Sequence, residues 1–148
     1  MLEKTIENYF SEYSDTYDKA KRALKNYLDA KEDFYNLTGT KYDDMPKAQS
    51  KKLGLDDLLI HIEELHTTWL MLDKKCKEEK AKCLIDIDKL ENKIYRLLIE
   101  YAYLNFESDK KILKSLKEIH NLDYSYSYIR KIKSKAKKEF KQIIIKNN

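Results

Sequence analysis

The residues with the clearest chemical potential form one helical stretch near the end of the sequence, from Ser125 to Phe140. Ser125 stands where a side-chain oxygen can cap the first turn of a helix. Apolar residues then recur at spacings of three, four and four, which is one helical face: Ile129, Ile132, Ala136 and Phe140. The opposite face is basic and holds Arg130, Lys131, Lys133, Lys135, Lys137, Lys138 and Lys141. A lysine-covered helix after a short turn is how a helix-turn-helix presents a recognition helix to DNA.

Basic charge is concentrated in this part of the chain. The whole sequence has a formal net charge of +4. Residues 108–148 contain 12 Lys and Arg against 4 Asp and Glu, a net charge of +8, whereas residues 1–107 contain 18 against 22, a net charge of −4. An anionic partner for the basic segment follows, and double-stranded DNA is the partner we expect. The alternative is a lysine-rich solvated tail, but the lysines lie opposite an apolar stripe, which favours DNA.

The composition predicts an elongated all-α protein. Only 2 glycines and 1 proline occur in 148 residues, and 38% of the residues are charged, which suits long exposed helices. We expect a long antiparallel helical hairpin, similar to a coiled coil, over residues 1–89. A C-terminal three-helix helix-turn-helix head would follow over residues 90–148.

The hairpin is predicted from a long heptad-like repeat. A first helix over about residues 2–36 has apolar residues spaced alternately by four and three, typical of a coiled-coil seam: Ile6, Phe10, Tyr13, Tyr17, Ala20, Leu24, Tyr27 and Phe34. Residues 37–53, which contain Gly39 and Pro46, are predicted to form a loop. Asp56 then resembles an N-cap, and a second helix runs to about residue 104 with a change of register near residues 83–87.

The head is predicted as three helices over residues 90–104, 109–121 and 125–145. The second is expected to be lined by Leu113, Leu116, Ile119 and Leu122. Asn121 and Asp123 are the turn residues best able to adopt a left-handed backbone.

Two segments resemble known proteins. The pattern from Ser125 through Ile129-Arg130 to Ala136 and Phe140 resembles the end of region 4 of bacterial sigma factors. The segment from Thr38 to Lys47 is similar to the connection in phage-encoded late transcriptional regulators of the RinA/ArpU kind, which join a helical hairpin to a sigma-region-4-like head. The resemblance implies a sequence-specific, DNA-binding transcriptional regulator of phage or prophage origin.

The resemblance also implies roles for individual residues. Ser125 would cap the recognition helix, and the positions that face the bases of the major groove would be Tyr126, Ser127, Arg130 and Lys131. Arg130 is the best candidate to bind the edge of a guanine base, because its guanidinium can form two hydrogen bonds to it. Lys135, Lys138 and Lys141 would contact phosphates without reading the sequence.

Other chemistry is not indicated by the sequence. Cys76 and Cys83 are seven residues apart on one predicted helix, too far for a bridge, and suggest reduced thiols of a cytoplasmic protein in a bacterial host cell. His61 and His66 lack the spacing of a helical metal pair. No phosphate loop or nucleophile elbow occurs, so we expect neither an enzyme nor a metal or cofactor, and no apolar run is long enough to predict a membrane span.

Two other functions remain open at this stage. The chain could be a coiled-coil interaction protein that acts on a protein partner and has a degenerate DNA-binding head. It could also be a small terminase-like DNA-packaging subunit, since these proteins couple a helix-turn-helix to a helical oligomerisation stalk. The sequence does not specify which operator is bound or whether transcription is activated or repressed. Contact with RNA polymerase and a homodimer through the stalk also remain open.

Overall fold

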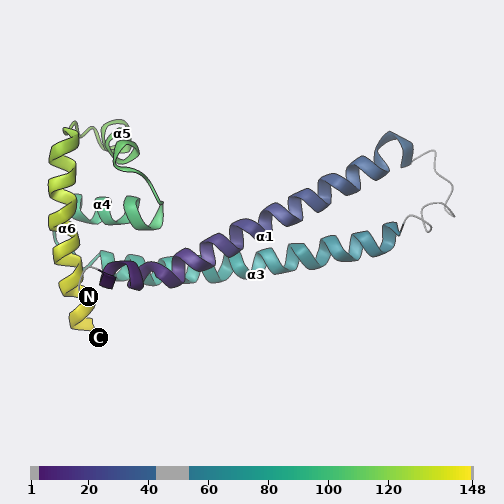
Figure 1. The fold of residues 1–148 in the computed structure, drawn as a ribbon, viewed down its shortest axis with the longest axis horizontal. Helices are drawn as coiled ribbons and strands as arrows, with labels where there is room; N and C mark the ends of the chain where they lie inside the picture. Colours follow the sequence, from purple (N-terminus) through teal and green to yellow (C-terminus); the bar gives the residue numbers. More distant parts are fainter. Residues whose placement is uncertain (1–3, 43–53, 148) are drawn as a thin grey trace. The chain divides into compact units, whose positions relative to one another are not determined.

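The computed structural model describes residues 4–42 and 54–147. Its helices, in chain order, are α1 (Lys4–Tyr42), α3 (Leu55–Ile87), α4 (Lys93–Ile99), the π-helix η1 (Glu100–Leu104), α5 (Asp109–His120) and α6 (Tyr126–Asn147). No strand occurs in either described range. The expected all-α fold is therefore confirmed, and its helices are labelled in Figure 1.

The chain divides into two compact units, and α1 and α3 each contribute to both. The hairpin unit runs from Asp15 to Lys77, and the C-terminal unit joins the start of α1, up to Ser14, to the chain from Glu78 onward. This division differs from the expected boundary between residues 89 and 90. The reason is that the first turns of α1 bury aromatic side chains among the C-terminal helices.

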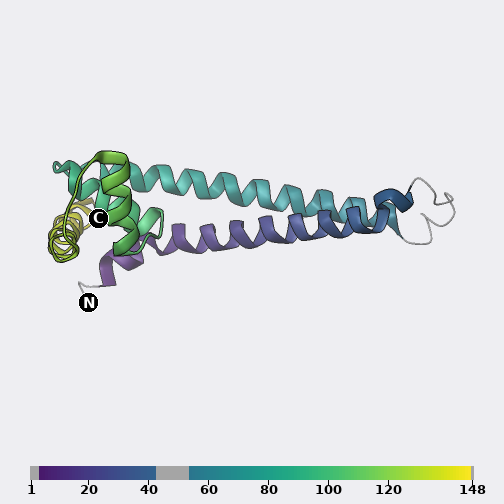
Figure 2. The same ribbon diagram turned by 90° about the horizontal axis from the view of Figure 1, so that it is seen from above.

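The hairpin unit consists of α1 and α3 side by side in opposite directions (Figures 1 and 2). Its seam is marked by Tyr27, whose ring lies 4.7 Å from that of His66 and 6.2 Å from that of Trp69. Ala20 is buried as expected, but Tyr17 is 36% exposed and Thr16 is buried in its place. The seam therefore passes through Thr16 and not Tyr17 at this point, between Tyr13 and Ala20.

Two hairpin boundaries differ from the expected ones. Helix α1 continues through Gly39 to Tyr42, where a loop was predicted, because one glycine costs a helix only about 1 kcal/mol relative to alanine. The rest of the predicted loop, residues 43–53, lies outside the described residues. Helix α3 begins at Leu55 after Gly54, which has a left-handed backbone with φ +66°, so Asp56 lies in the first turn and is not the N-cap.

A single helix to residue 104 was also predicted, and this is wrong. Helix α3 ends at Ile87, and a tight turn follows in which the Leu90 amide donates to the Ile87 carbonyl at 3.0 Å. Asn92 then caps α4, since its side chain accepts hydrogen bonds from the amides of Ile94 and Tyr95. The change of register seen in the sequence therefore marks the end of one helix and the start of the next, not a local change within one continuous helix.

An aromatic cluster links the beginning and end of the chain within the C-terminal unit. Phe10 of α1 stacks on Phe140 of α6 with ring centroids 5.6 Å apart, and on Tyr103 of η1 at 4.8 Å. Tyr9 meets the Phe140 ring edge-on at 5.5 Å, and the Tyr13 hydroxyl donates to the Leu104 carbonyl at 3.1 Å. Phe140 is fully buried. These contacts fasten α6 and η1 to the first turns of α1.

The second core cluster connects α4, α5 and α6. Its fully buried members are Leu98, Ile112, Leu116 and Ile129. The prediction for α5 was partly wrong, because Ile112 is buried whereas Ile119 is 68% exposed. Helix α5 crosses α6 steeply in both views (Figures 1 and 2).

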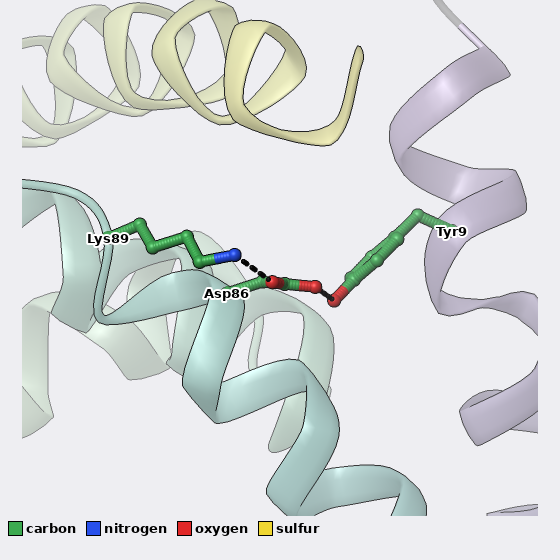
Figure 3. Close-up of polar contacts among 3 residues, drawn as sticks. All are labelled: Tyr9, Asp86 and Lys89. Carbon is green, nitrogen blue, oxygen red and sulfur yellow. Dashed lines mark hydrogen bonds and ion pairs between the residues drawn. The ribbon is translucent and has the colours of Figure 1, made fainter. Parts of the chain in front are cut away.

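A polar contact holds α1 against the end of α3 in the same unit (Figure 3). The Tyr9 hydroxyl donates to one carboxylate oxygen of Asp86, and Lys89 donates to the other at 2.9 Å. Burial alone raises the pKa of Asp86, but these two hydrogen bonds lower it more, so that its pKa lies below the ordinary value of 3.8. Burial also raises the pKa of the Cys83 thiol, to about 11, so this free cysteine is protonated at neutral pH.

Replacing Tyr9 with phenylalanine should lower the free energy of unfolding by about 1.5 kcal/mol at pH 7, because it removes a hydrogen bond to a charged group. Since the folded-state pKa of Asp86 is depressed, the stabilisation is present above its ordinary pKa and is lost as the pH falls through the folded value. Urea unfolding at neutral and acidic pH measures this loss. The difference from the wild type should shrink in acid, and Tyr128→Phe, at a 47% exposed tyrosine, should show none at either pH. A difference independent of pH would contradict the role of Asp86.

Candidate nucleic-acid interface

The turn before α6 has the geometry predicted from its sequence. Asn121 follows the last residue of α5 with φ 56° and ψ 35°, the left-handed region that asparagine tolerates. The Leu122 amide donates to the Leu116 carbonyl at 3.0 Å, which satisfies one carbonyl near the end of α5. Leu122 is thereby packed against the core cluster of α4, α5 and α6. Residues 121–125 lie between the two helices, and α6 begins at Tyr126.

Ser125 caps α6 as predicted. Its hydroxyl oxygen accepts a hydrogen bond from the Tyr128 amide at 3.3 Å, and its carbonyl accepts one from the Ile129 amide at 3.1 Å. The apolar stripe that follows is buried along its whole length: Ile129, Ile132, Ala136, Phe140 and, one turn later, Ile144. The stripe fixes the rotation of α6, and so decides which of its side chains reach solvent.

Replacing Ser125 with alanine should cost about 1 kcal/mol of stability, the usual value for the loss of an N-cap. Urea unfolding followed by circular dichroism would measure the loss. Ser134→Ala is the matched control, because Ser134 lies exposed in the middle of the same helix, where alanine is the better helix former. Equal stability of the two variants would show that the cap does not stabilise α6.

The structure brings the predicted DNA-binding residues together on one solvent-facing side of α6. Successive residues of a helix turn by about 100°, so the side opposite the buried stripe is formed by residues spaced three and four apart. We call this the basic face; it consists of Ser127, Arg130, Lys131, Ser134, Lys135, Lys138 and Lys141. Lys141 is half-buried, and the others are exposed. Ser134 is the member that the sequence prediction missed.

Tyr126 lies at one edge of this face and is 45% exposed. The Arg130 guanidinium carbon lies 5.8 Å from the centroid of the Tyr126 ring, a cation–π contact. The contact restricts the rotamers of Arg130, so the guanidinium is held near the first turns of the helix. Ser125 itself is exposed at the helix start, so its hydroxyl is accessible beside the free backbone amides of the first turn.

Two lysines that were predicted from the sequence to lie on the basic side of this helix have other roles. Lys133 forms an ion pair with Asp109 at 2.9 Å and so joins α6 to the start of α5. The ammonium group of Lys137 lies 5.9 Å from the centroid of the Tyr103 ring. Both side chains turn toward the protein, and neither belongs to the basic face.

The electrostatic character of the interface is strongly positive. Helix α6 contains 8 Lys and Arg residues and one acidic residue, Glu139. Helix α5 adds four exposed lysines that sequence reasoning did not assign to the site: Lys110, Lys111, Lys114 and Lys117. In the sequence, the only indication that these lysines belong to the interface is that they contribute to the +8 net charge of residues 108–148. A surface of this kind attracts an anionic polymer.

Other kinds of site find no support in the described residues. Across residues 4–42 and 54–147, the His, Cys, Asp and Glu side chains form no group of three that could hold a metal ion. Within the same ranges, no helix combines the length and apolar character needed to cross a membrane. Comparison with protein-family models, curated proteins and solved structures gave no match for this chain.

Proposed function

We propose that this protein is a sequence-specific, DNA-binding transcriptional regulator of phage or prophage origin that reads the major groove with α6. The observation that carries the proposal is the basic face of α6, an uninterrupted set of cations and serines on a helix whose other side is buried. A helix of this width fits the major groove, where base edges present a unique pattern of donors and acceptors. The resemblance to sigma region 4 and to the phage late regulators supports the same function.

Within this proposal, the residues near the start of α6 read bases and the later lysines contact phosphates. Ser127, Arg130 and Lys131 lie in the first two turns, and in helix-turn-helix proteins this part of the recognition helix contacts the base edges. Arg130 would bind a guanine through its two-pronged guanidinium. Lys135, Lys138 and Lys141 would bind the phosphates and set the position of α6 along the groove. Helix α5 would cross the DNA backbone, which its exposed lysines favour.

Binding of a fluorescent duplex of mixed sequence tests the proposal. Arg130→Ala should weaken the tightest-binding fraction by about 5- to 150-fold, which corresponds to the roughly 1–3 kcal/mol that a good bidentate base contact contributes. Lys19→Ala is the matched control, because Lys19 is an exposed cation on α1 in the hairpin unit. If Arg130→Ala and Lys19→Ala bound the duplex equally well, α6 would not be the reading helix.

A further inference from the structure

Two exposed tyrosines lie in the first turn of α6, one on each border of the basic face. Tyr126 is 45% exposed and Tyr128 is 47% exposed. At about 100° per residue, each tyrosine lies roughly 100° from the middle of the basic face, and the two lie in opposite directions around the helix. If α6 enters a groove with the middle of this face first, the borders lie nearer the two DNA strands than the base edges. Tyr126 therefore lies beside the residues that point to the bases and not among them.

The two tyrosines have different neighbours. The guanidinium carbon of Arg130 lies 5.8 Å from the centroid of the Tyr126 ring, and the two residues are four apart, which is about one turn of the helix. The Tyr128 ring instead lies 5.0 Å from the ring of Tyr124, which packs against the core cluster of α4, α5 and α6. One border of the basic face thus combines an aromatic ring with a cation, whereas the other combines two aromatic rings.

Arg130 has no acidic neighbour one turn away on its own helix. The residues three and four positions before and after it are Tyr126, Ser127, Lys133 and Ser134. In the part of the chain that the structure describes, no carboxylate forms an ion pair with its guanidinium. The face of an aromatic ring attracts the charge of the guanidinium and does not need its N–H groups as donors. Those N–H groups remain available to bind the edge of a base.

We infer that Tyr126 is a positioning residue for Arg130, and that its ring determines how strongly α6 prefers guanine at one position of its DNA site. An arginine side chain that is ordered before binding loses less conformational freedom when it binds, so its contact with the base is stronger. The ring supplies this effect and the hydroxyl does not, because phenylalanine attracts cations in the same way. The inference rests on the proposed function, in which Arg130 binds the edge of a guanine.

Parallel selections from one random duplex library at about 150 mM salt, each with a full-length protein, test the inference. The readout is the enrichment of guanine at the position where Arg130→Ala loses its preference. Tyr126→Leu should reduce this enrichment by about 2- to 5-fold, the range expected for an exposed cation–π contact, whereas Tyr126→Phe should keep the wild-type value. Tyr128→Leu is the matched control and should also keep it. Wild-type enrichment with Tyr126→Leu, or an equal loss with Tyr126→Phe, would overturn the inference.

A double variant separates an effect through Arg130 from a direct contact between Tyr126 and DNA. Arg130→Ala/Tyr126→Leu should bind the duplex selected by the wild type as tightly as Arg130→Ala alone, because the same contact cannot be lost twice. Weaker binding by the double variant would mean that Tyr126 touches DNA itself, and would overturn the inference while the proposed function stands. A wild type that enriches no motif would overturn both.

The contact can also be measured without DNA, by nuclear magnetic resonance of the free full-length chain. The ring current of Tyr126 should shift the Arg130 Hδ resonances in the wild type and in Tyr126→Phe. In Tyr126→Leu this shift should be lost, while circular dichroism shows unchanged helicity. Arg130 resonances that are the same in Tyr126→Leu as in the wild type would contradict the positioning role.

Discussion

Replacing Phe140 with alanine is expected to lower the free energy of unfolding by about 3–5 kcal/mol, the usual cost of truncating a buried phenylalanine. Phe140 is fully buried, stacks on Phe10 and meets the edge of Tyr9. Removing the ring leaves a cavity between α6 and the first turns of α1. Few other single changes would weaken the attachment of α6 as much.

Urea unfolding followed by circular dichroism would measure this effect. Ile145→Ala is the matched control, because Ile145 lies on the same helix and is 51% exposed, so its truncation should cost less than about 0.5 kcal/mol. A loss below about 1 kcal/mol for Phe140→Ala would contradict the packing of α1 against α6.

The second large effect concerns the lysines of the basic face. Replacing Lys135, Lys138 and Lys141 with glutamine should leave α6 helical but greatly weaken its binding to duplex DNA. Each phosphate contact that is lost reduces the slope of log affinity against log salt by about 0.9, so three contacts would reduce it by about 2.7. Titration of a fluorescent duplex between about 50 and 200 mM salt would measure the change, over which several such contacts alter affinity by orders of magnitude.

Lys133→Gln is the internal control for this experiment. Lys133 has the same charge and lies on the same helix, but it is paired with Asp109 at 2.9 Å. Its replacement should leave the salt slope unchanged. If the triple variant kept the wild-type slope as well, the basic face would not contact phosphates.

The local features of α6 could be predicted from the sequence because they depend on residues close together in the chain. Ser125 caps the helix, Asn121 adopts the left-handed backbone, and the stripe from Ile129 to Phe140 is buried as expected. Each of these signals is contained within about one or two helical turns. The exposed positions of Arg130, Lys131 and Lys138 follow directly from that stripe.

The features that were missed depend on contacts between distant residues or on competition at a boundary. Periodicity gives no indication that Phe10 meets Phe140, and so the expected boundary at residue 89 overlooked the first turns of α1. The apolar repeat of the second predicted helix appears continuous in the sequence, but the side chain of Asn92 caps a new helix, α4, within it. On α5, the choice between Ile112 and Ile119 depends on where α4 and α6 lie, which the spacing of apolar residues within α5 does not specify.

Selection of bound sequences from a random duplex library at about 150 mM salt tests the reading of DNA by α6 most directly, since non-specific binding is weak at physiological salt. The wild type should recover a defined motif, and Arg130→Ala should lose the preference for guanine at one position of that motif while keeping the rest. A folded, helical protein that enriches no motif, or an Arg130→Ala variant that enriches the unchanged motif, would contradict the proposal.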